Sequence, residues 1–294
     1  MRTLILVILD DKVDVKVMKV KILGSGQDDG IPHTGCYCEV CNKARTHAEY
    51  KRLGPSLAVL DKTENSCYLF DASPDFKYQL DMTHEEIRKT ERKGKLPVSG
   101  ILLTHAHLGH CAGLWHLGKE SVDEKELPVI CTPKMRQFLC SNYPFNLLVQ
   151  RGNIKIEERY PGKKFKLNRL ACVSIQVPHR NEIGDTVGYV IESKKKVIYL
   201  PDIDRWTNTV IEEVRDSDIA FVDGTFYSQN EICRFEEVPH PPIRETIELL
   251  EGIEGEIYFI HINHTNPINR KGKERKYIKR KGYKIAYDGM TLEV

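Results

Sequence analysis

The chain has 294 residues, of which 40% are hydrophobic and 29% charged, and its formal net charge is +2. This length suffices for one large domain or two small ones, and the composition is typical of folded globular proteins. The near-neutral charge gives no general support for nucleic-acid binding, and no segment approaches the roughly 20 apolar residues that a membrane span requires. We therefore expect a small-molecule substrate rather than a membrane or a nucleic acid, and leave open whether that substrate is anionic and whether the chain forms a homodimer.

The cysteine content indicates the cellular compartment, and the N-terminal segment indicates where the folded domain begins. Nine cysteines are an odd number and three are bunched, which favours a reducing compartment with thiolate ligands over a disulfide framework. We therefore expect a cytoplasmic protein. The apolar run Leu4–Leu9 is short and continues into Asp10 without a signal-peptide cleavage site. We assign residues 1–14 to an N-terminal extension and residues 15–294 to a single domain.

Apolar runs rich in β-branched residues alternate along the chain with segments of helical spacing. These patterns predict strands near residues 16–23, 56–60, 66–71, 99–103, 128–131, 171–177, 187–192, 196–200, 218–223, 256–260 and 283–287. They predict helices near residues 38–48, 73–80, 83–93, 108–119, 133–141, 206–214, 242–251 and 269–281. Each half of the chain consists mainly of predicted strands and ends in predicted helices. This order favours an α/β (α+β) fold of two mixed sheets packed face to face, with helices outside.

The first motif in chain order is the cysteine cluster Cys36-Tyr37-Cys38-Glu39-Val40-Cys41. Thiolates at positions i, i+2 and i+5 of a loop can surround one tetrahedral ion, and zinc favours sulfur at such closed structural sites. We interpret the cluster as three ligands of a structural zinc ion that needs a fourth. The remaining cysteines lie singly on apolar segments, and we assign them to the core.

The apolar run 100–103 leads into Thr104-His105-Ala106-His107-Leu108-Gly109-His110. Three histidines at the end of a buried strand are costly to satisfy with hydrogen bonds alone, whereas one metal ion satisfies all of them. His105 and His107 share one side of an extended chain, and His110 lies on the first turn of the helix that follows. We therefore predict that the three imidazoles converge on a metal ion.

Three later strands also end in a residue type that binds metals: His179 follows residues 173–177, Asp202 follows 196–200 and His261 follows 256–260. In open α/β sheets, binding and active sites lie at the carboxyl ends of the strands. A single histidine or aspartate there is usually structural, but four such ends with compatible ligand types indicate a metal centre. The basic stretch 270–284 is interpreted as a solvated helix face, with contact to an anionic substrate as the alternative.

In order and spacing, the histidine run followed by His179, Asp202 and His261 resembles the metallo-β-lactamase superfamily. Longer segments resemble the family of pyrroloquinoline quinone biosynthesis protein B: Leu23–Gly26 before the cysteine cluster, Asp71–Asp75, Gly184–Gly188, Asp223–Phe226, His261–Pro267 and Asp288–Met290. More distantly, the cysteine cluster, the metal residues and the closing Asp-Gly-Met are similar to the phosphoribosyl cyclic-phosphate phosphodiesterase of phosphonate breakdown. The resemblance implies an αββα sandwich with a one- or two-metal site at the sheet edges.

The resemblance also implies how the ligands divide. His105, His107 and His179 form the first metal position, and Asp202 bridges to the second. His110 and His261 remain for the second position, and His264 becomes the fourth ligand of the cysteine zinc.

The chain departs from the family at Gly109, where the family has an aspartate that binds the second metal. The second position then has no charged ligand of its own, so we expect one tightly held zinc, manganese or iron ion at the centre. Asp71, Asp223 and His240 are candidates to replace the missing ligand or to support the ligands through hydrogen bonds.

The leading hypothesis is a metal-dependent hydrolase that acts on a phosphodiester or another small ester through a metal-bound water, with Asp202, His261 and His110 as catalytic residues. One alternative is a mononuclear iron oxygenase or hydroxylase in quinone cofactor biosynthesis, since several histidines and one carboxylate with open positions suit iron(II). Another is a catalytically eroded binding protein, which explains Gly109 but not the three intact histidines.

Overall fold

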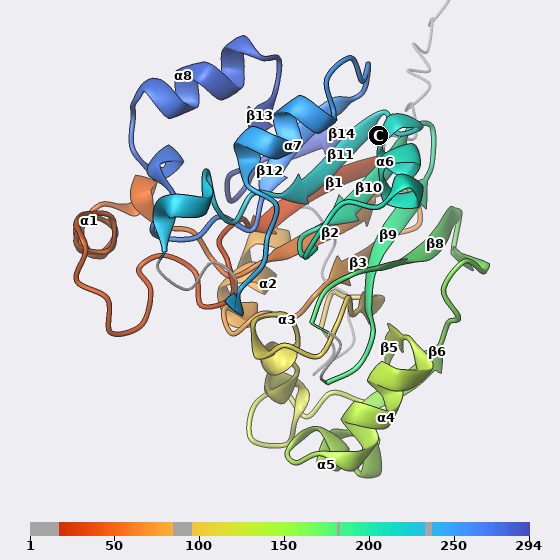
Figure 1. Cartoon of the computed structure of the whole chain (residues 1–294). Coiled ribbons are helices and arrows are strands. Elements are labelled where there is room, and N and C mark those ends of the chain that lie inside the picture. The colour runs from red at the N-terminus through yellow and green to blue at the C-terminus, as the bar shows by residue number, and fades with distance from the viewer. Residues whose placement is uncertain (1–17, 85–95, 181–182, 233–236) are drawn as a thin grey trace, which may run out of the picture.

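The strands form two seven-stranded sheets, shown in Figure 1. The computed structural model describes residues 18–84, 96–180, 183–232 and 237–294. In order across the first sheet, the strands are β14 (Thr291–Glu293), β1 (Met18–Gly24), β2 (Ser56–Asp61), β3 (Ser66–Phe70), β4 (Gly100–Leu102), β5 (Leu127–Cys131) and β6 (Ile154–Glu158). In order across the second sheet, they are β13 (Lys284–Ile285), β12 (Glu256–Ile260), β11 (Ile219–Asp223), β10 (Lys196–Leu200), β9 (Thr186–Glu192), β8 (Leu170–Val177) and β7 (Lys164–Leu167).

Both sheets combine antiparallel and parallel pairing in the same way. In the first sheet the pairs from β14 to β3 are antiparallel and those from β3 to β6 are parallel. In the second sheet the pairs from β7 to β10 are antiparallel and those from β10 to β13 are parallel. The mixed sheets expected from the sequence are therefore confirmed.

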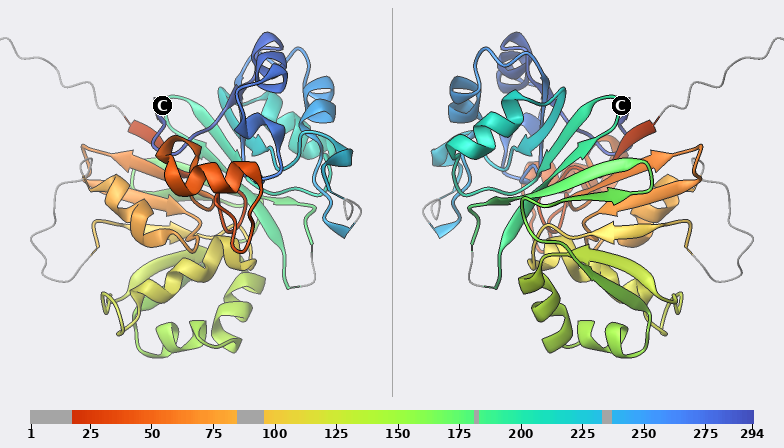
Figure 2. Two further views of the ribbon diagram at one scale, coloured as in Figure 1. Left: turned by 90° about the vertical axis from the view of Figure 1, so that its left-hand side faces the viewer. Right: turned by 90° about the vertical axis from the view of Figure 1, so that its right-hand side faces the viewer.

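Most of the helices lie on the outer faces of the two sheets, as the views in Figure 2 show, whereas the helix Glu39–Thr46 packs in a small cluster of its own. The α-helices are α1 (Glu39–Thr46), α2 (Phe76–Thr83), α3 (Leu108–Cys111), α4 (Pro133–Ser141), α5 (Phe145–Gln150), α6 (Asn208–Arg215), α7 (Ile243–Leu249) and α8 (Lys273–Arg280). Short 3-10 helices are η1 (Ala48–Tyr50), η2 (Ala112–Leu117), η3 (Gln229–Glu231) and η5 (Pro267–Asn269). None of the helices in the described ranges is both long and apolar enough to cross a membrane.

Three hydrophobic layers hold this arrangement together. Between the sheets, Phe70, Tyr199 and Phe221 belong to one cluster of fully buried side chains. Outside each sheet, a second and a third cluster join the outward side chains of the strands to the helices. In β10, for example, Tyr199 faces the inner cluster and Ile198 the outer one. Central strands are therefore buried on both faces, which explains their continuous apolar sequences. The predicted αββα sandwich is confirmed.

Some elements differ from the sequence predictions. The edge strands β6 and β7 were not predicted, because they are short and alternate apolar with charged residues. The helix α5 and the strand β14 were also not predicted. The helix expected over residues 108–119 divides into α3 and η2. Most of the helix expected over residues 83–93 lies outside the described residues.

Candidate metal centre

Three of the predicted ligands meet where β4 and β8 end. His107 Nδ1 lies 2.9 Å from His105 Nε2 and 3.2 Å from His179 Nε2, and both flanking rings are buried. Three ring nitrogens that face one point cannot all be satisfied by sharing protons. A tetrahedral zinc ion with Zn–N bonds of about 2.0–2.1 Å would place its nitrogen ligands about 3.3 Å apart, close to the spacing found here. The first metal position expected from the sequence therefore fits a metal ion.

Hydrogen bonds behind two of these rings fix their orientation. Thr104 Oγ1 donates to Asp71 Oδ1 over 2.9 Å, and the same oxygen lies 2.9 Å from His105 Nδ1. Asp204 Oδ1 lies 2.9 Å from His179 Nδ1. In each ring the Nδ1 proton is held by an oxygen, which leaves the Nε2 lone pair directed at the centre. Burial also lowers the pKa of His105 well below its usual value, so this ring stays neutral and able to bind a cation.

A second group of ligand atoms lies on the other side of Asp202. Its Oδ2 atom is 2.7 Å from His110 Nε2 and 3.2 Å from His261 Nε2. All three atoms are buried and have no hydrogen-bond partner of acceptable geometry. Buried polar atoms are rarely left unsatisfied, and a cation between them would satisfy all three. The carboxylate of Asp202 also lies 3.8 Å from the Nε2 atoms of His105 and His179, between the two groups.

The rings of the second group are supported in the same manner as those of the first. His110 Nδ1 lies 2.8 Å from Asp71 Oδ2. His261 Nδ1 lies 2.8 Å from Thr225 Oγ1, which donates to Asp223 Oδ1 over 2.7 Å. An Asp–Thr–His arrangement therefore occurs once in each sheet. Asp71 and Asp223, which the sequence left as ligands or supporting residues, support ligands in this structure.

Backbone strain accompanies the centre. Asp71 and His261 are fully buried and have φ angles of 65° and 62°, in the left-handed region. Residues other than glycine rarely adopt this conformation, and where they do they cluster at functional sites.

His240 lies beside the metal ligands, and its ring forms a further set of neighbouring ligand atoms with Asp202, Asp223 and His261, all within 4.8 Å of one another. Its Nδ1 atom is 2.6 Å from Asp223 Oδ2 and 3.7 Å from Asp202 Oδ1. Burial would lower the pKa of His240, but the charge and the hydrogen bond of Asp223 raise it to about 9. A buried histidine that remains protonated at neutral pH can donate a proton.

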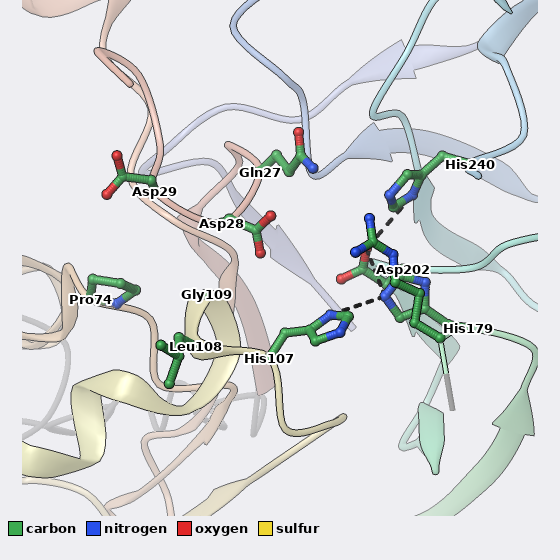
Figure 3. A pocket seen from close by; sticks show the side chains of 11 residues that line it. Gln27, Asp28, Asp29, Pro74, His107, Leu108, Gly109, His179, Asp202 and His240 are labelled. Carbon is green, nitrogen blue, oxygen red and sulfur yellow. Dashed lines mark hydrogen bonds and ion pairs between the residues drawn. The ribbon is translucent and has the colours of Figure 1, made fainter. Parts of the chain in front are cut away.

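A cavity of about 340 Å³ opens onto the centre, and Figure 3 shows the side chains that line it. The lining residues are Gln27, Asp28, Asp29, Pro74, His107, Leu108, Gly109, His179, Arg180, Asp202 and His240. Arg180 is the cation of this set besides the histidines, and its buried Nε has no hydrogen-bond partner within the described structure. The basic stretch 270–284 does not line the cavity, so the structure does not support its contact with a substrate there.

The cysteine cluster and His264 form a separate group of ligands. His264 Nδ1 lies 3.5 Å from Cys36 Sγ and 3.6 Å from Cys38 Sγ, and Cys41 completes the group. These separations fit a tetrahedral zinc ion with Zn–S bonds of about 2.3 Å. The Cys38 thiol also accepts a hydrogen bond from the Cys41 amide and thereby caps α1. The other described cysteines, apart from half-buried Cys140, are buried, and Cys233 lies outside the described residues.

Comparison with known proteins identifies the family. The model of the beta-lactamase superfamily domain matches residues 67–262. The chain belongs to the beta-lactamase superfamily. Within it, coenzyme PQQ synthesis protein B of Rhizobium meliloti (strain 1021) is 30% identical over 307 residues, covering 94% of this chain and 98% of the relative. The family resemblance seen in the sequence is thus confirmed.

Solved structures of this superfamily agree with the fold. Zn²⁺-bound PqqB from Methylobacterium extorquens has a TM-score of 0.83 and 26% identity, covering 94% of this chain and all of that one (100%). A diphosphatase from the PhnP family has a TM-score of 0.71 and 23% identity, covering 95% and 97%, and shows the shared fold.

The sequence reasoning missed several residues of the site, among them Arg180, Asp204 and Asp28. Arg180 and Asp204 lie next to predicted ligands in the sequence, but a single arginine or aspartate carries no distinctive pattern. Asp28 lies in Gln27-Asp28-Asp29-Gly30 soon after β1 ends, and two adjacent carboxylates just beyond a strand end are a signal that could have been noted.

Proposed function

We propose that this protein is a metal-dependent hydrolase that cleaves a phosphodiester or another small anionic ester. The observation that carries the proposal is the pair of ligand groups on either side of Asp202, which face a cavity lined by Arg180, whose buried Nε atom has no hydrogen-bond partner among the described residues. Divalent ions held by such ligands lower the pKa of bound water to about 7 and polarise a phosphoryl or carbonyl oxygen.

The residues of the chain have distinct roles in this proposal. His105, His107 and His179 would hold the first ion, and Asp202, whose carboxylate lies between the two ligand groups, would serve both groups. The guanidinium of Arg180 binds an anionic oxygen of the substrate and fixes its position in the cavity. His110 and His261 serve as ligands, because their Nε2 atoms face Asp202.

We assign proton donation to His240. Asp223 Oδ2 lies 2.6 Å from Nδ1 of this ring and fixes its orientation, and the ring lines the cavity. In the protonated ring, Nε2 donates its proton to the leaving oxygen of an ester in the cavity. In this scheme the proton donor lies beside the metal ligands and is not one of them.

A role in quinone cofactor synthesis is the second candidate. It is favoured by the similarity to coenzyme PQQ synthesis protein B, which extends over 94% of this chain. In this case the histidines would hold iron(II) for an oxidation, since histidines with a carboxylate suit that ion.

One experiment separates the two candidates. Protein loaded with zinc or manganese is expected to cleave bis(p-nitrophenyl) phosphate, and His179→Ala to lose at least a hundredfold in kcat/KM. Arg180→Ala is expected to raise KM more than it lowers kcat, because it removes a substrate contact rather than a metal ligand. An absence of cleavage, together with oxygen consumption by the iron(II)-loaded protein, would contradict hydrolysis and support the second candidate.

A further inference from the structure

By the resemblance seen in the sequence, Gly109 stands where the family has a metal-binding aspartate, and the space beside this glycine is already filled. A Cβ atom added at Gly109 would lie 2.3 Å from Asp28 Oδ1 and 2.6 Å from Asp28 Cα. Both distances are too short for non-bonded atoms. The backbone and the side chain of Asp28 therefore occupy the volume in which a side chain at position 109 would begin.

The carboxylate of Asp28 lies with the two histidines of the second ligand group. A carboxylate oxygen of Asp28 and one ring nitrogen each of His110 and His261 all lie within 4.8 Å of one another. No hydrogen bond or ion pair engages the Asp28 carboxylate among the residues the structure describes. Figure 3 shows this carboxylate above Gly109, on the cavity side.

Backbone hydrogen bonds hold the loop of Asp28 against the strand end that carries His261. The Gln27 amide donates to Ile262 O over 3.1 Å, and the Gly30 amide donates to Gln27 O over 2.7 Å. The side-chain amide of Asn263 also donates to the side chain of Gln27. Asp28 itself has a φ of 37°, a left-handed conformation that aspartate tolerates better than most residues. The carboxylate is thus presented by a fixed loop.

We propose that Asp28 supplies the carboxylate ligand of the second metal position, from the loop after β1 instead of from position 109. The position then has four protein ligands, namely Asp28, His110, His261 and the bridging Asp202. The orphaned Nε2 and Oδ2 atoms of the last three are the independent sign that a cation belongs there.

This proposal replaces the expectation of a single tightly held ion at the centre. That expectation assumed that Gly109 leaves the second position without a carboxylate, and it did not consider a ligand from a loop about 80 residues earlier. The proposal concerns metal binding and does not depend on which reaction the centre performs.

Metal content measured by mass spectrometry on protein loaded with zinc and desalted tests the proposal. The wild type is expected to retain three ions per chain, two at the centre and one at the cysteine cluster. Asp28→Asn is expected to retain two, because an amide cannot replace the charge. The matched control is Asp29→Asn, which changes the neighbouring carboxylate and is expected to retain three.

A conservative variant distinguishes a ligand from a residue that only shapes the loop. Asp28→Ala is expected to lose the second ion, whereas Asp28→Glu is expected to retain it, because the longer side chain still carries a carboxylate on the same loop. Gly109→Asp alone is expected to lower both the melting temperature and the metal content, since its Cβ atom would clash with the backbone and the side chain of Asp28.

A spectroscopic measurement provides a readout without substrate. In manganese-loaded protein, electron paramagnetic resonance is expected to show a spin-coupled pair, and Asp28→Ala to show isolated ions. The proposal is overturned if the wild type never retains more than two ions per chain, or if Asp28→Asn and Asp28→Ala retain three. Neither result bears on whether the loaded protein cleaves an ester.

Discussion

At the scale of single residues, the centre depends on the ring nitrogens that face away from it. Thr104, Asp71, Thr225 and Asp204 each lie within 2.9 Å of such a nitrogen. These contacts select the tautomer and hold the ring, so that the opposite nitrogen is ready to bind before any ion arrives. The ligands are preorganised by neighbours that never touch the metal.

Asp204 is the neighbour whose removal is easiest to interpret. Asp204→Asn keeps the size of the side chain but weakens the hold on His179 Nδ1. Loss of such a supporting residue lowers metal affinity by about 10- to 100-fold. We expect a loss of this size at the first position, measured by competition with a chromophoric chelator.

The matched control is Asp216→Asn, which changes an exposed carboxylate that pairs with Lys196. It should leave the affinity unchanged. Equal affinity of Asp204→Asn and the wild type would show that His179 needs no support from this side.

At this scale the sequence predicted the ligands better than their supporting residues. His105, His179, Asp202 and His261 each follow an apolar strand, so a local pattern marks them. Asp28 is different, because its position beside His110 depends on how a loop packs against Gly109. No pattern within either segment contains that contact.

At the scale of elements, the segment after β12 links the two metal sites. His261 faces the centre, and three residues later His264 faces the cysteine cluster. The ring of His264 also stacks on His33, with centroids 4.8 Å apart. A zinc ion at the cysteines would therefore fix the loop 33–41 to the same strand end that carries His261.

Cys38→Ser tests this link. The variant is expected to lose one zinc ion per chain and to have a lower melting temperature, because three of four ligands do not hold a structural ion tightly. Metal content and thermal unfolding are measured on the same sample. Cys140→Ser is the control, since Cys140 lies on α4 and belongs to no ligand group among the described residues. A full zinc content in Cys38→Ser would remove this cysteine from the site.

Prediction of elements succeeded where a strand is buried on both faces. β4, β10 and β12 are continuous apolar runs, which a sequence reader identifies directly. The strands β6 and β7 lie at the ends of their sheets and are partly exposed, so charged residues interrupt their patterns. Gly113 has a packing role that the helical pattern of 108–119 hides, because an added Cβ would lie 2.2 Å from Ser73 O.

At the scale of the whole molecule, the strand ends that carry the metal ligands in the two sheets lie side by side. Residues that follow strands of the first sheet (Asp71, His105 and His110) meet residues that follow strands of the second (Asp202 and His261) at one edge of the sandwich. The inner cluster that contains Phe70, Tyr199 and Phe221 lies between the same strands. Packing between the sheets therefore sets the distance between the two halves of the centre.

The measurement that tests this account most directly is a crystal structure of the zinc-loaded protein with anomalous diffraction at the zinc edge. We predict one peak enclosed by His105, His107 and His179, a second between Asp202, His110 and His261, and a third at the cysteines. Histidine rings that point apart, with no anomalous peak between them, would contradict the metal centre and the functions built on it.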